Sequence, residues 1–413
     1  MAFARSSLTP CDSSPSNVRR FWTHNGTHEC VTLTLKPDVK NAAKRSNPQK
    51  IMNIPTKKVC IPILIALLAG SAGYGFQPKR EVAPLAKPNI LILYADDLGY
   101  GDLGSFNPDS KIPTPHLDRL AEQGVRFTDA HSSSGICSPS RYAMLSGRYH
   151  WRKFHGIVGA FGPSAFDAAE LTLSEMLQAE GYTTATIGKW HLGWDWDSIK
   201  KPGAERFVYH PKGRSSFEPD DLDWSKPVAG GPLAHGFDYY FGDTVINFPP
   251  YVWIENDRIL GEPDRMVDVD LLRPAKEGGW TPRPGPIVED WDPYDNIPVT
   301  TRKGIAKIHE FAAKQEPFFL LFSYPSPHTP IVPNDGFDGR SQAGPYGDHV
   351  VETDESIGRL LAALDVSGAA ENTIVIFTAD NGAEWLAYAR DVKTGHWSSH
   401  PFRGGREGVK HRI

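Results

Sequence analysis

The feature that most constrains the fold is a repeated alternation of short apolar runs with amphipathic segments. The runs are "NILILYADD" at 89–97, "YTTATIGKW" at 182–190, "PFFLLFSY" at 317–324 and "NTIVIFTADNG" at 372–382. Most of their residues are apolar or β-branched, as expected for strands that are buried on both faces. Strands of this kind are typical of parallel sheets.

Segments with the spacing of helices lie between these runs. They cover residues 114–124, 171–181, 302–315 and 349–368, and a further strand is predicted at 125–130, "VRFTDA". The first helix ends at Gly124, a residue type common just after helices. The alternation predicts an α/β fold in which helices cover both faces of a mostly parallel central sheet.

The stretch 194–300 has a different composition, rich in Trp, Pro, Gly and Asp. It predicts long insertion loops with a hairpin around "YVWIENDRI" at 251–259. Loops of this length on a rigid sheet often shape access to a site. A loosely ordered surface is the alternative. Residues 89–413 are long enough to form one domain around a large core.

The segment "KKVCIPILIALLAGSAGYG" at 57–75 has the organisation of a secretory signal peptide: two lysines, an apolar run and then small residues. Its apolar part is shorter than the roughly 20 residues of a membrane-spanning helix. Pro62 weakens the alternative of a buried core helix. We therefore expect a signal peptide at 52–75, a Pro-rich linker at 76–88, and an exported protein, periplasmic or secreted, without a stable membrane anchor.

Residues 1–51 are basic, rich in Ser, Asn and Pro, and lack hydrophobic periodicity. We expect synthesis to start at Met52; a disordered targeting extension is the alternative. Residues 1–75 hold ten of the 44 Lys and Arg but only three of the 49 Asp and Glu, so 34 basic and 46 acidic residues remain. The net charge after cleavage is then −12 rather than −5, which argues against nucleic-acid or anionic-membrane binding.

Cleavage would leave Cys137 without another cysteine in the chain, because Cys11, Cys30 and Cys60 all precede residue 75. An exported protein that keeps one unpaired thiol needs a reason for it.

The surrounding sequence, "CSPSRYAMLSGR" at 137–148, predicts a helix with Pro139 in its first turn. On this helix Tyr142, Leu145 and Tyr149 would share one face. Free N–H groups at its start favour anions near Cys137. Arg141 adds a permanent planar cation one turn later. A thiolate nucleophile fits these features, but the histidine and asparagine context of a cysteine protease does not accompany it.

Two of the predicted strands end in pairs of oxygen-bearing side chains, Asp96-Asp97 and Asp380-Asn381. Ligands of open α/β sheets bind beyond the carboxyl ends of the strands. Four oxygen donors suit a hard divalent cation, calcium rather than zinc. Ordinary turn or capping residues are the alternative for either pair alone.

The stretch at 137–148 resembles the signature of the type I sulfatases, in which the cysteine is oxidised to Cα-formylglycine before folding by a formylglycine-generating enzyme. Four more stretches resemble motifs of that family and follow its order: "YADDLGYGDLG" at 94–104, "IGKWHLG" at 187–193, "PSPHTP" at 325–330 and "FTADNG" at 377–382. The resemblance extends from residue 86 to about 406. It implies an alkaline-phosphatase-like catalytic domain, without the family's small C-terminal α+β domain.

The resemblance also implies a role for each matching residue. Arg141 and Lys189 would bind sulfate, His328 would protonate the leaving alcohol, and His191 would assist the release of sulfate. The implied ligands of Ca²⁺ are Asp96, Asp97, Cys137 as formylglycine, Asp380 and Asn381. The implied reaction is hydrolysis of aryl or carbohydrate sulfate esters, through a hydrated formylglycine and a sulfo-enzyme intermediate.

Arg406, in "FRGGREG", stands where the family has a sulfate-binding lysine, so it keeps the charge but not the shape of that side chain. Two other functions remain open at this point. One is a phosphonate or phosphate monoester hydrolase of the same superfamily, because phosphate and sulfate have similar shapes. The other is a non-catalytic binder of sulfated glycans.

Cleavage of the predicted signal peptide can be tested by N-terminal sequencing of exported protein. We expect the first residue to fall between about residues 72 and 80, because small residues at the end of the apolar run favour cleavage there. An exported protein that starts at Met1 would contradict the prediction.

Overall fold

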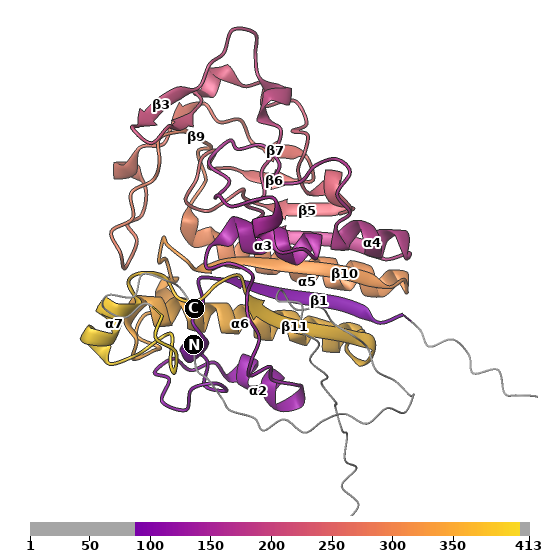
Figure 1. Cartoon of the computed structure of the whole chain (residues 1–413), viewed down its shortest axis with the longest axis vertical. Coiled ribbons are helices and arrows are strands. Elements are labelled where there is room, and N and C mark those ends of the chain that lie inside the picture. Colours follow the sequence, from indigo (N-terminus) through magenta and orange to yellow (C-terminus); the bar gives the residue numbers. More distant parts are fainter. Residues whose placement is uncertain (1–86, 405–413) are drawn as a thin grey trace, which may run out of the picture. The chain divides into compact units, whose positions relative to one another are not determined.

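The computed structural model describes residues 87–404, and their main sheet is mixed (Figure 1). Its strands are β1 (Asn89–Asp96), β2 (Thr183–Gly188), β5 (Tyr239–Gly242), β6 (Trp253–Glu255), β7 (Arg258–Leu260), β10 (Phe318–Pro327) and β11 (Thr373–Ala379). They follow the order β11-β1-β10-β2-β5-β6-β7. The first five in this order are parallel, and β6 and β7 are antiparallel. The predicted mostly parallel sheet is confirmed.

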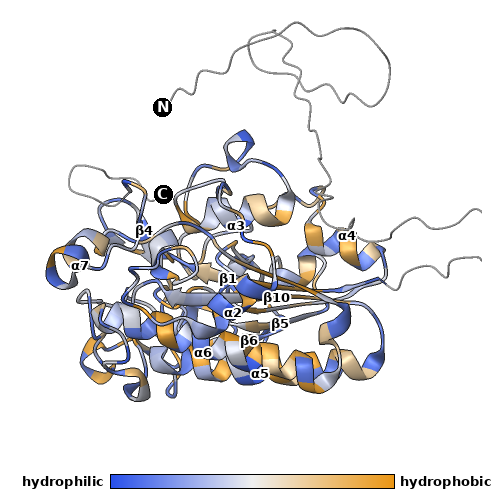
Figure 2. Cartoon of the chain, turned by 90° about the horizontal axis from the view of Figure 1, so that it is seen from below, coloured by the Kyte–Doolittle hydropathy of each residue, from blue (hydrophilic) through white to orange (hydrophobic). Residues whose placement is uncertain are grey.

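Helices cover both faces of the sheet, as predicted. Figure 2 shows α3 (Cys137–Ser146) and α4 (Leu173–Ala179) on one side and α5 (Asn296–Lys314) and α6 (Gly344–Ser367) on the other. The helix α2 (Pro115–Gln123) packs on α6, where Asp354 accepts hydrogen bonds from the N–H groups of His116 and Leu117. A short helix, α7 (Ala387–Thr394), follows β11.

The continuous apolar pattern of β1 follows from this layering. Ile92 and Tyr94 pack into the core beneath α3, whereas Leu91 and Leu93 pack into the core beneath α5 and α6. Leu91 and Leu93 are fully buried. Because both faces of the strand are covered, alternation of polar and apolar residues would leave polar groups inside one of the two cores.

Two local predictions are wrong. Residues 125–130 do not form a strand: they run as a loop in which the side chains of Val125 and Phe127 are 81% and 71% exposed. The edge of the sheet beside β1 is taken by β11 instead. Tyr149 does not share the buried face of α3, because the helix ends at Ser146 and Gly147 turns the chain with a φ of 63°.

The stretch 194–300 holds short elements, among them β3 (Phe207–His210), β4 (Arg214–Ser216), β8 (Arg265–Met266) and β9 (Pro286–Ile287). The predicted hairpin appears as β6 and β7. The interpretation as loosely ordered surface is wrong, because the side chains of Trp194, Phe217 and Trp224 are buried in the core. Figure 1 shows β3 and β9 beyond the β7 edge of the sheet.

Several predicted features lie outside the described residues: segments 1–51 and 52–75, most of the linker at 76–88, and Arg406. All described residues belong to one compact unit. Among residues 87–404, no helix combines the length and the apolar character needed to cross a membrane.

The close packing of β2 against β10 makes a prediction about Gly188. This glycine has a φ of 100°, and a Cβ there would lie 2.0 Å from the carbonyl oxygen of Ser323. Gly188→Ala should therefore lower the free energy of unfolding by about 3 kcal/mol or more. Gly181 is the matched control, since its φ is 83° with nothing within 4 Å, so Gly181→Ala should cost only about 1–2 kcal/mol. Equal losses in urea unfolding experiments would contradict the packing argument.

Candidate active site

The parallel strands place polar side chains together where their carboxyl ends meet, at one end of the sheet. β1 ends at Asp96 and is followed by Asp97, β2 is followed by Lys189, and β11 is followed by Asp380 and Asn381. His328 follows β10, and Cys137 is the first residue of α3. The structure therefore brings the predicted strand-end pairs, the cysteine, the arginine one helical turn after it and the lysine into one cluster.

The carboxylate of Asp96 lies at the centre of this cluster and is completely buried. Its Oδ1 accepts a hydrogen bond from Cys137 Sγ at 3.4 Å, and its Oδ2 forms an ion pair with Lys189 Nζ. Nη2 of Arg141 lies 3.8 Å from Oδ1. Burial by itself would raise the pKa of Asp96, but the nearby cations, Lys189 first, hold it below its usual range.

Arg141 is fixed along both edges of its guanidinium group. Nε donates to Asp380 Oδ2 at 3.0 Å, and Nη2 lies 2.9 Å from the same oxygen. Nη1 donates to the Lys189 carbonyl at 3.2 Å and to Ser323 Oγ. The group also lies 5.1 Å from the centre of the Tyr94 ring. Burial opposes its charge, but the carboxylates keep the pKa of Arg141 above its ordinary value.

The carboxylates form a candidate metal centre. One oxygen each of Asp96, Asp97 and Asp380 lie within 4.8 Å of one another, and these side chains are at most 1% exposed. Asn381 Nδ2 donates to Asp97 Oδ1 at 2.5 Å, and Asn381 Oδ1 is buried with no hydrogen-bond partner among the described residues. Burial and the charge of Asp96 raise the pKa of Asp380. Concentrated negative charge and an unpaired amide oxygen fit a hard divalent cation.

Cys137 belongs to a second group of candidate ligands, with Asp96 and His328, whose ligand atoms also lie within 4.8 Å of one another. The cysteine side chain is 4% exposed. Burial and the charge of Asp96 raise the pKa of the thiol well above its usual value, so the thiol is neutral here. This environment does not favour the thiolate nucleophile considered from the sequence.

The loop that carries Asp97 is held by distant parts of the chain. Asp97 has a φ of 59°, a conformation that aspartate tolerates better than most residues. Asp102 Oδ2 accepts from the N–H of Gly99 at 2.7 Å and from the hydroxyl of Tyr346 at 2.6 Å. Asp102 Oδ1 lies 2.8 Å from Nε2 of His396. The position of Asp97 thus depends on α6 and on residues beyond α7.

His328 presents one ring nitrogen to the cluster. Nδ1 carries the proton that it donates to the carbonyl of Thr329, because a carbonyl can only accept. Nε2 lies 3.7 Å from Asp97 Oδ2, and the side chain is 14% exposed. His328 therefore lies between the buried carboxylates and the solvent.

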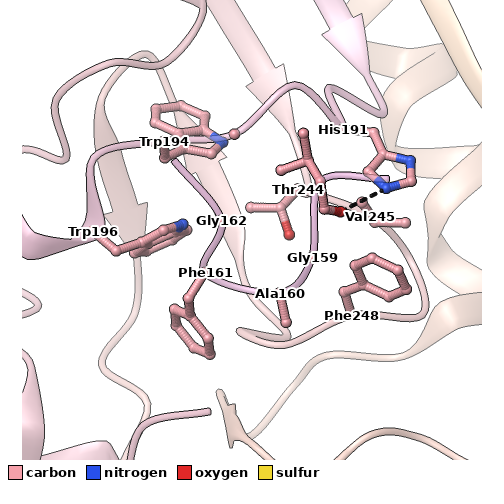
Figure 3. A pocket seen from close by; sticks show the side chains of 12 residues that line it. Gly159, Ala160, Phe161, Gly162, His191, Trp194, Trp196, Thr244, Val245 and Phe248 are labelled. Carbon is pink, nitrogen blue, oxygen red and sulfur yellow. Dashed lines mark hydrogen bonds between the residues drawn. The ribbon is translucent and has the colours of Figure 1, made fainter. Parts of the chain in front are cut away.

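His191 is more buried than His328, and its donating ring nitrogen is Nε2 rather than Nδ1. Nε2 donates to the Val158 carbonyl at 3.1 Å, a bond drawn in Figure 3, while Nδ1 is buried with no hydrogen-bond partner among the described residues. Burial and the charges of Lys189 and Arg141 lower the pKa of His191 well below its usual value. The ring is therefore neutral, with a lone pair on Nδ1. The cavity beside it, about 10 Å³ and partly lined by Phe248, has room for one water at most.

Two polar residues near the cluster were not predicted, Ser323 and Asp243. Ser323 lies inside a predicted apolar strand, where nothing marked its hydroxyl as a contact for Arg141. Asp243 directly follows β5, as Asp380 follows β11. An aspartate after a strand was the available signal, but the prediction of loops over 194–300 concealed β5.

A mostly parallel sheet with helices on both faces, with buried carboxylates and fixed cations at its carboxyl edge, defines the alkaline-phosphatase-like class of α/β enzymes. A family model described as "Sulfatase" matches residues 88–410. The chain belongs to the sulfatase family.

Individual relatives agree with this assignment. The chain is 32% identical over 354 residues to an N-acetylgalactosamine-6-O-sulfatase of Bacteroides thetaiotaomicron, which covers 78% of this chain and 64% of the relative. It is 33% identical over 383 residues to the steryl-sulfatase of Mus musculus, with coverage of 84% and 60%. The chain thus spans somewhat under two thirds of the length of these relatives.

Among solved structures, a Bacteroides thetaiotaomicron sulfatase connected with the metabolism of multiple glycosaminoglycans matches with a TM-score of 0.63 and 30% identity. The match covers 78% of this chain and 68% of that protein. The fold predicted from the sequence is therefore confirmed by both the sheet topology and the comparison.

The candidate metal centre predicts stabilisation by a divalent cation. Addition of Ca²⁺ to chelator-treated protein should raise its Tm by several degrees, because a ligand at about 100 times its Kd contributes about 2.7 kcal/mol. Asp97→Asn should remove most of this shift, since asparagine tolerates the positive φ but lacks the charge. Asp109→Asn, the same change at an exposed position, should keep it. Equal shifts in both variants, measured by thermal unfolding, would argue against the site.

Proposed function

We propose that this chain is the catalytic part of a calcium- and formylglycine-dependent sulfatase that hydrolyses sulfate esters to an alcohol and inorganic sulfate. The observation that supports this most is the environment of Cys137. A neutral, buried cysteine contacts Asp96 in a cluster that also holds Arg141 and Lys189. A thiol that is not activated as a nucleophile fits a precursor of another reactive group.

Formylglycine derived from Cys137 would supply a hydrated aldehyde, in which one oxygen attacks sulfur and the other allows the sulfate to be expelled. Ca²⁺ held by Asp96, Asp97, Asp380, Asn381 and the modified Cys137 would supply positive charge that favours the ionised hydroxyl and offsets the charge of the sulfate. The remaining steps depend on the other side chains of the cluster.

Arg141 and Lys189 would bind the sulfate oxygens. The guanidinium group of Arg141 cannot turn freely, because Asp380 and Ser323 hold its two edges. The Lys189 ammonium is completely buried beside Asp96. Cations that are oriented before the reaction stabilise developing negative charge at no cost of reorganisation. Because the net charge of the chain is −5, this attraction for an anion acts locally.

The two histidines suit opposite proton transfers. With Nδ1 of His328 engaged by the Thr329 carbonyl, Nε2, which lies 3.7 Å from Asp97 Oδ2, is the ring nitrogen that would pass a proton to the oxygen of the leaving alcohol. With Nε2 donating to the Val158 carbonyl, Nδ1 of His191 has a lone pair without a partner among the described residues and would accept the proton that is lost when sulfate is expelled. One histidine would therefore act as the acid and the other as the base.

Carbohydrate sulfates are the proposed substrate class, because relatives include N-acetylgalactosamine-6-sulfatases. Export to the periplasm or the medium, and modification of Cys137 by a formylglycine-generating enzyme, are parts of the same proposal. Arg406 is proposed as a further contact for the sulfate group.

The reaction class can be tested by comparing kcat/KM for an aryl sulfate with that for the matching aryl phosphate. The sulfatase proposal predicts a clear preference for the sulfate ester. A preference for phosphate would support the phosphate or phosphonate monoester hydrolase instead. Binding of sulfated glycans without turnover of either ester would support the non-catalytic binder.

The role of Cys137 can be tested directly. Peptide mass spectrometry of protein expressed with a formylglycine-generating enzyme should show an aldehyde in place of the thiol. Cys137→Ala should abolish measurable turnover. Cys137→Ser should leave a sulfated enzyme, because an alcohol lacks the second oxygen that expels sulfate.

Ser146→Ala, in the last turn of the same helix, is the control and should keep its turnover. A protein that retains a free thiol at Cys137 and still hydrolyses sulfate esters would show that the proposed chemistry is wrong.

A further inference from the structure

The fifth parallel strand of the sheet, β5, is also followed directly by a charged residue, Asp243. β5 pairs with β2 in the register Ala185↔Tyr239, Thr186↔Tyr240 and Ile187↔Phe241. Continued by two residues on each strand, this register places Asp243 level with Lys189. Neighbouring parallel strands lie about 4.8 Å apart, so the two residues leave the sheet side by side.

The backbones remain close beyond the last paired residues. The hydroxyl of Tyr240 donates to the Gly188 carbonyl at 3.2 Å, and a Cβ on Gly242 would lie 2.1 Å from the same oxygen. One residue after Asp243, the carbonyl of Thr244 accepts a hydrogen bond from the N–H of His191 at 3.0 Å. These contacts hold the segment of Asp243 against the segment that carries Lys189.

Asp243 is buried, with 2% exposure, and only one of its carboxylate oxygens is satisfied. Oδ2 accepts from Asn296 Nδ2 at 2.8 Å, whereas Oδ1 is buried with no hydrogen-bond partner among the described residues. Burial raises the pKa of Asp243 to about 7, and the nearby charge that most strongly opposes this rise is that of Lys189. A buried carboxylate oxygen without a partner is costly unless a cation or a proton satisfies it.

The ammonium group of Lys189 can likewise take a second hydrogen-bond partner. Its ammonium group carries three donors, and its ion pair in this structure is with Asp96, which is itself a candidate metal ligand. A cation that binds Asp96 would draw on the same carboxylate charge. The ammonium group would then require another counter-charge to remain oriented toward a sulfate oxygen.

We propose that Asp243 is the positioning residue of Lys189. In this structure the ammonium group pairs with Asp96; when a cation binds Asp96, the unpaired Oδ1 of Asp243 would take over the ammonium group and hold it on the side opposite the bound anion. The inference rests on the proposed function, because it assigns Lys189 to sulfate binding. Asn296, at the start of α5, orients the carboxylate through its amide.

The test is the affinity for inorganic sulfate, measured by calorimetry on the full chain at pH 8, where Asp243 is ionised, together with kcat and KM for an aryl sulfate. Asp243→Asn should weaken sulfate binding about tenfold, as expected for loss of a charge-assisted hydrogen bond. In the Lys189→Ala background the same change should have no further effect on either measure, because the two residues act as one unit.

An unchanged or increased affinity of Asp243→Asn for sulfate would overturn the proposal. If Asp243 did not position Lys189, removing its negative charge would leave the affinity for an anion unchanged or increase it. Additive losses in the double variant would equally refute the coupling.

Asn296→Ala provides a second route if Asp243→Asn does not fold. It keeps the charge of Asp243 but removes its orienting hydrogen bond, so sulfate binding should weaken in the same direction, about threefold. Asp238→Asn is the matched control: Asp238 lies just before β5, at the opposite end of the strand, and accepts from the N–H of Thr184. That variant should change thermal stability without changing the affinity for sulfate.

The outcomes also separate this inference from the proposed function. Sulfate binding that depends on Asp243, without turnover of any sulfate ester, would support the pairing with Lys189 and refute the proposed function. Turnover of sulfate esters with an affinity that does not respond to Asp243 or Asn296 would refute the pairing alone.

Discussion

The architecture of the site depends on one constraint, the burial of charged groups of both signs in a single small volume. Ionised side chains are costly inside a protein unless they are paired and hydrogen-bonded. Here Asp380 pairs with Arg141, Asp96 pairs with Lys189, and Asp97 lies in the same cluster with its Oδ2 3.7 Å from Nε2 of His328. A divalent cation held by these carboxylates would add positive charge to the cluster, so the same arrangement that fits a metal would also become more attractive to an anion once the metal is bound.

The parts of this arrangement that the sequence predicted share a physical reason. Parallel strands bring their carboxyl ends to one edge, so polar residues directly after apolar runs, such as Asp97 and Asp380, had to converge. For the missed residues this signal was absent or hidden. Asp243 follows a four-residue strand inside an irregular stretch, where periodicity is too short to recognise. The loop at 125–130 was predicted as a strand from β-propensity alone, which cannot reveal that the place beside β1 is taken by β11. Its exposed Phe127 shows that tertiary context overrode the local preference.

The segment 194–300, predicted to be loops, forms part of the wall of the site. Phe248 packs edge-on against the ring of His191, with centroids 5.3 Å apart, and the guanidinium group of Arg283 lies 3.5 Å from the centre of the Phe248 ring. The Phe248 ring thus covers one side of His191. The insertion therefore contributes to the chemistry indirectly, because it helps to bury His191, and burial is the largest cause of the lowered pKa of this imidazole.

The position of β1 in the sheet has a consequence for how the protein is made. Both of its neighbours are distant in sequence: Asn89 lies beside Thr373, 284 residues later, and Ile90 beside Phe319. At about 5–20 residues per second, a ribosome needs roughly 15 to 60 s to supply the strand on its outer side. During that time β1 has an unpaired edge, and Asp380 and Asn381 are not yet available to complete the metal centre. Such non-local pairing predicts slow folding and a long period in which the nascent chain depends on chaperones.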